Sequence, residues 1–433
     1  MSRKRINIIT LGCSKNLVDT ERVLSMLSKA GYEAVHQEPV KKGDIVIINT
    51  CGFIGDAKEE SINTILEYLQ GKENGEIDRV YVMGCLSQRY RADLEQELPD
   101  VDGWYGKFNF AEIVADLTGK SNPIVTIDRT VTTPPHYTYL KIAEGCNRFC
   151  AFCAIPLITG RFKSRTESEL VDEVKMLVDR GVKEFNVIAQ DLSSYGLDID
   201  GTMRLPQLID KIAGINGVEW IRLHYAYPAQ FPMEVMDVMA AHDNVCNYMD
   251  IALQHASDKV LKNMRRHITA DETRALIAEM RRRVPGLHLR TTLMTGFPGE
   301  GEREFEELMQ FVKDMRFERM GAFAYCEEDD TYAARNYTDS IPQEVKQERL
   351  DALMELQEGI SMEIQQEKTG KILRTIIDRE EAEYYVGRTE WDSPEVDPEV
   401  LVKKTELLKP GEFYNIHIDE ALPFELIGTK SAK

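Results

Sequence analysis

The chain has 433 residues, 43% hydrophobic and 29% charged, which is long enough for two or three globular domains. Its 73 acidic and 53 basic residues give a formal net charge of −20, which disfavours general binding to nucleic-acid phosphates. No segment approaches the roughly 18–20 apolar residues of a membrane helix, and the apolar run before Cys13 is too short for a signal peptide. We therefore expect a cytoplasmic protein whose eight cysteines stay reduced and can bind metal.

The first predicted domain, residues 1–122, alternates short β-branched segments with amphipathic ones. The segments expected to form strands or helices are 6–11, 17–31, 44–50, 56–71 and 79–84. Such alternation predicts an α/β domain with a parallel sheet covered by helices. Residues 121–136, rich in Pro, Thr and Asn, interrupt the pattern and are expected to form a linker.

The second predicted domain, residues 132–366, resumes the alternation and ends in a long helix over 342–368. Its expected strands are 139–145, 183–191, 219–226, 247–254, 287–296 and 319–326. Six strands with helices between them predict a partial (β/α) TIM-like barrel, whose site lies at the carboxyl ends of the strands. The last predicted domain, residues 367–433, has short alternating segments and frequent turns. That pattern predicts a small antiparallel β-barrel.

Three cysteines follow the first strand of the predicted TIM-like barrel in the spacing CxxxCxxC. They are Cys146, Cys150 and Cys153, and one loop with this spacing can wrap an iron–sulfur cluster. Three thiols would leave one iron of a 4Fe–4S cluster without a protein ligand, and an open position is what a metal needs to bind a substrate directly. The alternatives are a zinc knuckle and incidental core thiols. A zinc site should have a fourth ligand nearby, but His136 lies before the whole strand.

A second set of cysteines lies in the first domain, each at the end of a predicted parallel strand. They are Cys13, Cys51 and Cys85. Because ligands bind at the carboxyl edge of such sheets, the three thiols could converge there on a second metal site. The alternative is that each is a small buried apolar residue. Cys246 is interpreted as a core residue, and Cys326 is given no role.

The CxxxCxxC spacing, with Phe152 before its last cysteine, resembles the radical S-adenosylmethionine superfamily. This resemblance implies that the open iron chelates S-adenosylmethionine, whose one-electron cleavage gives a 5′-deoxyadenosyl radical. Both thiol sets together, followed by a small β-barrel, resemble the methylthiotransferases over essentially the whole chain. That family implies two 4Fe–4S clusters, S-adenosylmethionine as the source of the methyl group and of the radical, and an electron donor such as flavodoxin or ferredoxin.

Local strings favour one branch of that family. LGCSKNLVDTE (11–21), IAQDLSSYG (188–196), DIALQHASDKVLKNMRR (250–266) and GRTEWDSPEVD (387–397) resemble the RimO type. This type methylthiolates the β-carbon of an aspartate in the twelfth small-subunit ribosomal protein. The alternative substrate is a modified adenosine of tRNA, which a basic groove on the small β-barrel would favour.

The charge of the last domain is a separate observation on the substrate. Residues 371–433 contain 14 acidic and nine basic residues, and nine of the acidic ones lie within 374–399. An acidic barrel suits a Lys- and Arg-rich ribosomal protein and makes direct RNA binding unexpected. The alternative is an ordinary solvated acidic surface. A protein of another class, a non-catalytic cluster or zinc protein with a docking barrel, would bind iron without cleaving S-adenosylmethionine.

The remaining site predictions are weaker, and no residue is assigned a catalytic role. The family resemblance makes Phe152, Ile155, Gln190 and Gly296 candidates for contact with S-adenosylmethionine, with core packing or a plain turn as the alternatives. Gly296 opens GFPGE (296–300), which lacks the Gly-Lys-Ser/Thr of a phosphate-binding loop. Asp191, beside Gln190, could likewise contact the cofactor or the substrate. Arg265, Arg266 and 281–283 are interpreted as solvated helix faces.

Overall fold

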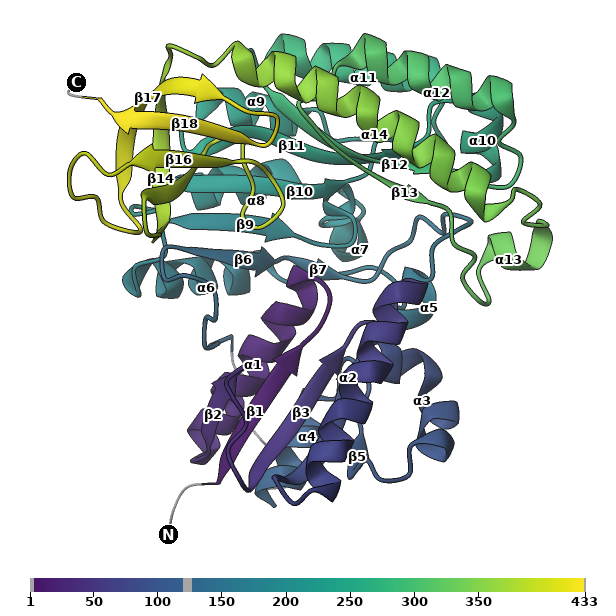
Figure 1. The fold of residues 1–433 in the computed structure, drawn as a ribbon, viewed down its shortest axis with the longest axis vertical. Coiled ribbons are helices and arrows are strands. Elements are labelled where there is room, and N and C mark those ends of the chain that lie inside the picture. Colours follow the sequence, from purple (N-terminus) through teal and green to yellow (C-terminus); the bar gives the residue numbers. More distant parts are fainter. Residues whose placement is uncertain (1–3, 120–126, 432–433) are drawn as a thin grey trace. The chain divides into compact units, whose positions relative to one another are not determined.

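The computed structural model describes residues 4–119 and 127–431, which belong to two compact units (Figure 1). Unit 1 comprises 1–133, 144–147 and 153–163, and unit 2 comprises 134–143, 148–152 and 164–433. None of the helices in the described ranges is long and apolar enough to cross a membrane.

Unit 1 is built on a parallel sheet of five strands in the order β2-β1-β3-β4-β5. Its strands are β1 (Arg5–Thr10), β2 (Glu33–His36), β3 (Asp44–Thr50), β4 (Ile77–Gly84) and β5 (Gly103–Trp104). Its helices are α1 (Ser14–Ala30), α2 (Gly55–Glu73), α3 (Cys85–Glu97), α4 (Phe110–Thr118) and α5 (Ile155–Thr159).

Both faces of this sheet are buried, because alternate residues of its strands pack against helices on opposite sides. One core joins Ile45 and Ile47 to residues of α1 and α4, and the other joins Val46 and Ile48 to residues of α2 and α3. The predicted parallel α/β domain is therefore confirmed. Strands β2 and β5 are additional to the prediction, and β5 has only two residues.

The predicted linker, 121–136, falls partly outside the described residues. From residue 127 onward it packs on helix α1 through Glu21. The Glu21 carboxylate forms a fully buried ion pair with Arg129 and accepts a hydrogen bond from the backbone N–H of Thr132, 2.7 Å away. Residues 127–133 of the linker therefore belong to unit 1, and 134–136 begin unit 2.

Unit 2 begins with an open sheet of six strands in the order β13-β12-β11-β10-β9-β6, all parallel. The strands are β6 (Tyr137–Lys141), β9 (Glu184–Ile188), β10 (Trp220–Ala226), β11 (Val245–Gln254), β12 (His288–Thr295) and β13 (Arg319–Ala324). The main helices are α6 (Glu167–Asp179), α8 (Leu205–Ala213), α9 (Glu234–Ala241), α10 (Asp258–Asn263), α11 (Ala270–Arg283), α12 (Glu302–Met315) and α14 (Gln343–Gln366). Shorter elements of unit 2 are α7 (Leu197–Asp200) and α13 (Tyr332–Asn336). The two-residue strands β7 (Ala143–Glu144) and β8 (Lys163–Ser164) each have one residue in either unit.

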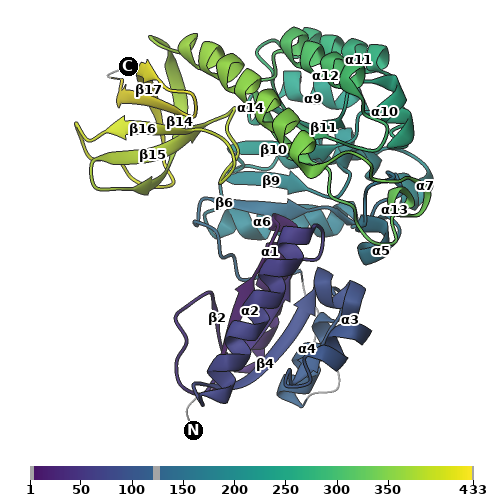
Figure 2. The same ribbon diagram turned by 45° about the vertical axis from the view of Figure 1, so that its right-hand side comes forward.

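This open parallel sheet confirms the predicted partial barrel. Helices α6 and α11 begin where the sequence provides capping boxes, Thr166 with Glu169 and Thr269 with Glu272. Helix α14 packs along strand β13 at the edge of the sheet and leads to the C-terminal strands (Figure 2).

The chain ends in a closed barrel of five strands in the order β14-β15-β16-β18-β17. The strands are β14 (Ile372–Glu380), β15 (Tyr384–Thr389), β16 (Glu399–Lys403), β17 (Phe413–Ala421) and β18 (Glu425–Lys430). The predicted small β-barrel is confirmed, except that β16 and β18 run parallel. An odd number of strands cannot close with every pair antiparallel, so one parallel pair is required.

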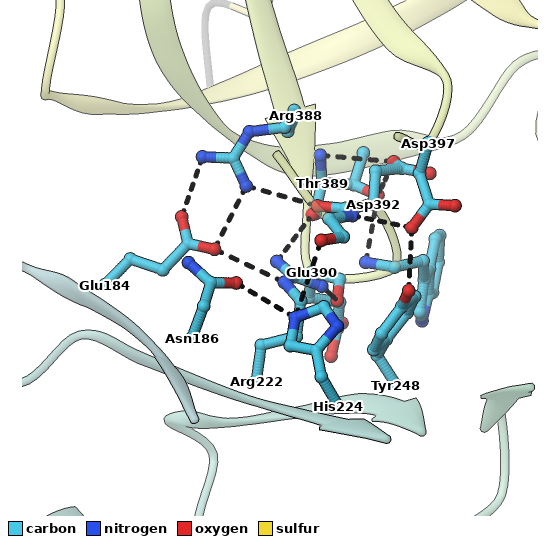
Figure 3. A network of polar contacts seen from close by, with 12 residues as sticks. Glu184, Asn186, Arg222, His224, Tyr248, Arg388, Thr389, Glu390, Asp392 and Asp397 are labelled. Carbon is cyan, nitrogen blue, oxygen red and sulfur yellow. Dashed lines mark hydrogen bonds and ion pairs between the residues drawn. The ribbon is translucent and has the colours of Figure 1, made fainter. Parts of the chain in front are cut away.

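Buried charges join the closed barrel to the open sheet within unit 2 (Figure 3). Arg388 of the barrel donates two hydrogen bonds, of 3.0 and 2.8 Å, to the two carboxylate oxygens of Glu184 on β9. Arg222 on β10 lies 3.3 Å from the same carboxylate. All three side chains are at most 2% exposed, so this ion network is part of the core.

The loop between β15 and β16 adds more carboxylates to this network. Asp392 lies 2.6 Å from Arg319, and Asp397 accepts a hydrogen bond of 2.8 Å from the Tyr248 hydroxyl. Glu395 accepts hydrogen bonds of 3.3 Å from the hydroxyls of Tyr137 and Tyr139. Asp392 and Asp397 are therefore paired inside unit 2, whereas the glutamates at 380, 381, 383 and 395 are exposed. The charge excess of 374–399 thus lies partly in the core, and it cannot by itself identify a basic partner.

Candidate metal centres

The three thiols of the first set gather at the carboxyl edge of the unit 1 sheet. Cys13 caps the amino end of α1, Cys51 directly follows β3, and Cys85 is the first residue of α3. Cys51 and Cys85 follow residues that pair in register, Thr50 with Gly84. A methyl group added to Gly12 would lie 2.8 Å from Cys51 Sγ. Their strand-end positions thus place the three thiols at one edge of the sheet, and their role as metal ligands stays a prediction.

A buried polar frame supports this edge. The Asn16 side chain donates hydrogen bonds to the carbonyls of Leu11 and Thr50, at 3.1 and 3.0 Å, and so ties α1 to the ends of two strands. Lys107, 2% exposed, lies 3.2 Å from Asn16 Oδ1 and 2.8 Å from Asp19 Oδ2. Burial opposes the charge of Lys107, but Asp19 outweighs it and raises the Lys107 pKa well above its usual value. The Lys107 ammonium therefore places a fixed positive charge near Cys13 and Cys85.

The three thiols differ in how readily they ionise. Desolvation opposes ionisation of Cys13, yet the charges of Lys15 and Lys107 and the N–H groups at the start of α1 lower its pKa. Burial raises the pKa of Cys51, and it raises the pKa of Cys85 to about 12. Two of the three thiols would therefore need a bound metal to become thiolates at neutral pH.

The residues around this edge fit a thiolate-bound cluster. Thiolates are the donors of iron–sulfur sites. Beside them, the buried hydroxyl oxygens of Ser14 and Ser87 have no hydrogen-bond partner among the described residues. In the described ranges, no three His, Cys, Asp or Glu side chains lie in the arrangement of a metal site.

The CxxxCxxC loop is divided between the two units. In unit 1, the Cys146 amide donates a hydrogen bond of 3.3 Å to the Gly160 carbonyl. Ala154, which follows Cys153, packs with Ile158 and Cys85 in one small apolar cluster. Cys85 of the first set therefore packs on the residue that follows Cys153. Ile155, predicted to contact S-adenosylmethionine, is half-buried at the start of α5.

Cys150 belongs to unit 2, where a buried arginine contacts its thiol. Arg266 Nη1 lies 3.2 Å from Cys150 Sγ, and the Arg266 side chain is 3% exposed. Its guanidinium lies over the Tyr227 ring, 4.2 Å from the centroid, and the Tyr227 hydroxyl donates a hydrogen bond of 2.6 Å to the Arg266 carbonyl. Cys150 thus has a permanent cation as its neighbour.

The interpretation of Arg266 as part of a solvated helix face is therefore wrong. Helix α10 ends at Asn263 and α11 begins at Ala270, and Arg265 between them has a positive φ. This turn directs Arg266 into the protein, whereas the Arg265 guanidinium lies over the Tyr332 ring. Arg281, Arg282 and Arg283 form ion pairs on the outside of the helices, as predicted.

Two of the candidate cofactor contacts lie at the carboxyl ends of unit 2 strands. Phe152 packs edge-to-face on Phe297, with ring centroids 6.3 Å apart. Gln190 follows β9 and is half-buried, while the adjacent Asp191 caps a short 3₁₀ helix (Leu192–Ser194) and accepts a hydrogen bond of 2.7 Å from Arg148. Asp191 therefore fixes Arg148 of the cysteine loop.

Gly296 has an explanation within the fold. Its φ is +75°, and any side chain there would collide with Lys346 of helix α14. The Gly296 amide donates a hydrogen bond of 2.9 Å to Glu300 Oε2. Close packing of α14 thus accounts for glycine at this position, independently of any cofactor.

Cys246 and Cys326 belong to neither thiol set. Cys246 is 1% exposed among Trp220, Tyr248 and Ile376, which confirms its predicted core position. Cys326 is exposed just after β13.

Comparison with known proteins places the chain beside curated enzymes over its full length. The ribosomal protein uS12 methylthiotransferase RimO of Phocaeicola vulgatus is 59% identical over 98% of this chain and 99% of its own. The proteins of the same name from Parabacteroides distasonis and Bacteroides fragilis are 57% and 58% identical, each over 99% of both chains. Family models match residues 5–106 (Uncharacterized protein family UPF0004), 140–312 (Radical SAM superfamily) and 369–430 (TRAM domain).

Solved structures share the fold at low sequence identity. The radical S-adenosylmethionine methyltransferase TsrM from Kitasatospora setae, with cobalamin and a 4Fe–4S cluster bound, has a TM-score of 0.56 and 14% identity. This match covers 86% of this chain and 79% of TsrM. The cobalamin-dependent radical enzyme OxsB has a TM-score of 0.51 and 13% identity, over 83% of this chain and 56% of OxsB. These likenesses show the fold alone.

Proposed function

Because the chain belongs to the family of ribosomal protein uS12 methylthiotransferases, we propose that it methylthiolates an aspartate of that protein. The modification adds CH3–S– to the aspartate β-carbon by radical S-adenosylmethionine chemistry. The observation that carries this function is identity of 55–59% to seven enzymes of this name across essentially whole chains.

Two 4Fe–4S clusters and S-adenosylmethionine are the cofactors of this reaction; when bound, they supply the electron, the hydrogen-abstracting radical and the methyl group. We propose that one cluster is held by Cys13, Cys51 and Cys85, and that the other is held by Cys146, Cys150 and Cys153. The convergence of the first three thiols and the spacing of the second three support these assignments.

The protein's own groups prepare each thiol set for a cluster. The Lys107 ammonium and the amino end of α1 favour the charged form of Cys13, and Asn16 fixes α1 against the strand ends. The Arg266 guanidinium, 3.2 Å from Cys150 Sγ, places a positive charge beside that sulfur atom. Both cations are buried, so water does not weaken them.

Aromatic and apolar groups surround the Cys150 side of the second thiol set. Ala151 packs in one buried cluster with Phe297, Tyr325 and Met264, and Phe152 lies against its edge. A dry surround protects a reactive radical from water. We propose Phe152, Ile155, Gln190 and Gly296 as candidate neighbours of S-adenosylmethionine; the strand-end positions of Phe152 and Gln190 support this, whereas packing alone explains Gly296.

The proposal extends to the organisation and partners of the chain. We propose three functional parts, 1–122, 132–366 and 367–433, and the three matched family ranges lie inside them. The last part would recognise the substrate. We place the enzyme in the cytoplasm, where ribosomal proteins are made, with flavodoxin or ferredoxin as the one-electron donor.

Purified uS12 and tRNA that carries the modified adenosine, but not its methylthio group, distinguish the proposed substrate from its alternative. The enzyme is reconstituted anaerobically with iron and sulfide and given S-adenosylmethionine, a reductant and each substrate in turn. We expect mass spectrometry to find methylthio-aspartate in uS12 and no change in tRNA nucleosides. Modification of tRNA instead would refute the proposed function.

A further inference from the structure

A groove of about 410 Å3 lies in unit 2, between helix α14, the first residues of β12 and β13, and two loops of the closed barrel. We refer to it as the α14 groove. The barrel contributes Val396 and Phe424, whose side chains are 60% and 58% exposed. These two side chains offer apolar surface that a partner in the groove would bury.

The α14 side of the groove is acidic. Asp351, Glu355 and Glu358 are spaced at i, i+4 and i+7, so their carboxylates follow one stripe of the helix. Glu355 and Glu358 are exposed and form no hydrogen bond or ion pair with any residue of 4–119 or 127–431. Unlike Asp392 and Asp397 of the β15–β16 loop, these two are available to a partner. They attract Lys and Arg and repel phosphates.

Two arginines also line the groove, but neither cancels this charge. Arg319 lies 2.6 Å from Asp392, and Arg290 lies 3.3 Å from Asp397, which itself lines the groove. Deeper in the groove, Gln357 is 3% exposed and its Oε1 has no hydrogen-bond partner among the described residues. The groove thus offers a buried acceptor as well as carboxylates, which favours a ligand rich in N–H donors.

The α14 groove is far from the cysteine loop along the sheet. Arg290 and Arg319 stand near the amino ends of β12 and β13, whereas Ala151, beside Cys150, packs with Phe297 beyond the carboxyl end of β12. Eight residues of strand β12 span about 26 Å. A ligand that occupies the groove and also reaches the cysteine loop must therefore be a macromolecule.

We propose that the α14 groove is a docking site for a segment of the ribosomal-protein substrate that combines Lys or Arg with an apolar side chain. The inference rests on the proposed function, since uS12 is the partner whose basic surface matches these carboxylates. The apolar side chain would cover Val396 and Phe424, and the cation would pair with Glu355 and Glu358. Docking at this distance affects substrate affinity and leaves the chemical step unchanged.

Two double variants of the reconstituted full chain test the docking site: Glu355→Lys with Glu358→Lys, and Val396→Ser with Phe424→Ser. Glu234→Lys with Glu306→Lys is the matched control, because these exposed glutamates lie on α9 and α12, outside the groove, and the charge change is identical. The dissociation constant for purified uS12 is measured together with KM and kcat. Cleavage of S-adenosylmethionine without uS12 and iron content report intact sites.

We expect both groove variants to raise the dissociation constant and KM for uS12 at least tenfold, with kcat and iron content within twofold of wild type. The control variant should bind uS12 as wild type does. Unchanged affinity in both groove variants, while wild type modifies uS12, would overturn the docking site and leave the function standing. If wild type fails to modify uS12, the function and the docking site both fall. Loss of self-association in the groove variants, with unchanged uS12 binding, would identify a second copy as the occupant and overturn the proposal.

Discussion

Replacing Glu184 by Gln tests whether buried charge holds the closed barrel on the open sheet. Burial opposes ionisation of Glu184, but the charges of Arg388 and Arg222 outweigh it and lower its pKa. The Gln variant keeps the shape and removes the charge. It leaves two guanidinium groups buried, with Asp378 as the remaining carboxylate beside Arg388. Breaking one partner out of a buried ion network costs about 3–5 kcal/mol.

The junction between the closed barrel and the open sheet also offers a matched control. Glu219, just before β10, pairs with Arg374 of β14 at 2.6 Å, but both side chains are nearly half exposed. Solvent screens such a pair, so Glu219→Gln should cost no more than about 1 kcal/mol. The two variants therefore compare a buried and an exposed charge pair across one junction.

Urea unfolding of the cluster-free protein provides the assay. Trp220 packs edge-to-face on Phe413 of the barrel, with ring centroids 4.8 Å apart, so its fluorescence reports separation of the barrel from the sheet. Glu184→Gln should lower the unfolding midpoint strongly and expose the chain between α14 and β14 to limited proteolysis. A loss below about 1 kcal/mol, or an equal loss for Glu219→Gln, would refute the argument.

Three further predictions concern buried cations. Arg266→Met removes a positive charge beside Cys150. The variant should lower the midpoint potential of the cluster proposed at Cys146, Cys150 and Cys153 by roughly 100–200 mV, measured by redox titration with electron paramagnetic resonance. Arg265→Met is the control and should leave this potential unchanged. Lys107→Met leaves Asp19 buried without its cation, so thermal unfolding should show a loss of about 3–5 kcal/mol that adding Asp19→Asn partly restores. Burial, reinforced by Arg319, lowers the pKa of Lys368 to about 7. Between pH 7 and 10.5 the unfolded chain binds this proton and the folded chain does not, so the free energy of unfolding of the wild type rises with pH. At pH 6.5 the Lys368→Met variant should be more stable than wild type, by at most roughly 4–5 kcal/mol. Near pH 10 this difference in stability should vanish.

The positions of the first thiol set were predictable because they depend on a regular feature. Parallel strands present their carboxyl ends at one edge, so recognising β1, β3 and β4 is enough to place Cys13, Cys51 and Cys85 at that edge. The strands that were not predicted have no alternating or continuous apolar sequence pattern. Strand β5 has two residues, and β2 has four that are at best half-buried.

The residues that surround the thiols were beyond sequence reasoning. Arg266 lies in a run of basic residues that predicts a solvated helix face. Only the turn at Arg265 directs the Arg266 side chain to Cys150. Lys107 is separated from Asp19 by 88 residues, so no local pattern connects them. A count of charges also does not show which charges are paired. Asp392 and Asp397 were therefore counted as acidic surface, although they form ion pairs in the core.

Iron content tests the central claim most directly, because the proposed chemistry needs two clusters on two thiol sets. Wild type, the triple Ala variant of Cys13, Cys51 and Cys85, and the triple Ala variant of Cys146, Cys150 and Cys153 are reconstituted anaerobically. We expect about eight irons in wild type and about four in each variant, with methylthio-aspartate formed in uS12 by wild type alone. About four irons in wild type and in the first variant alike would contradict the two-cluster account.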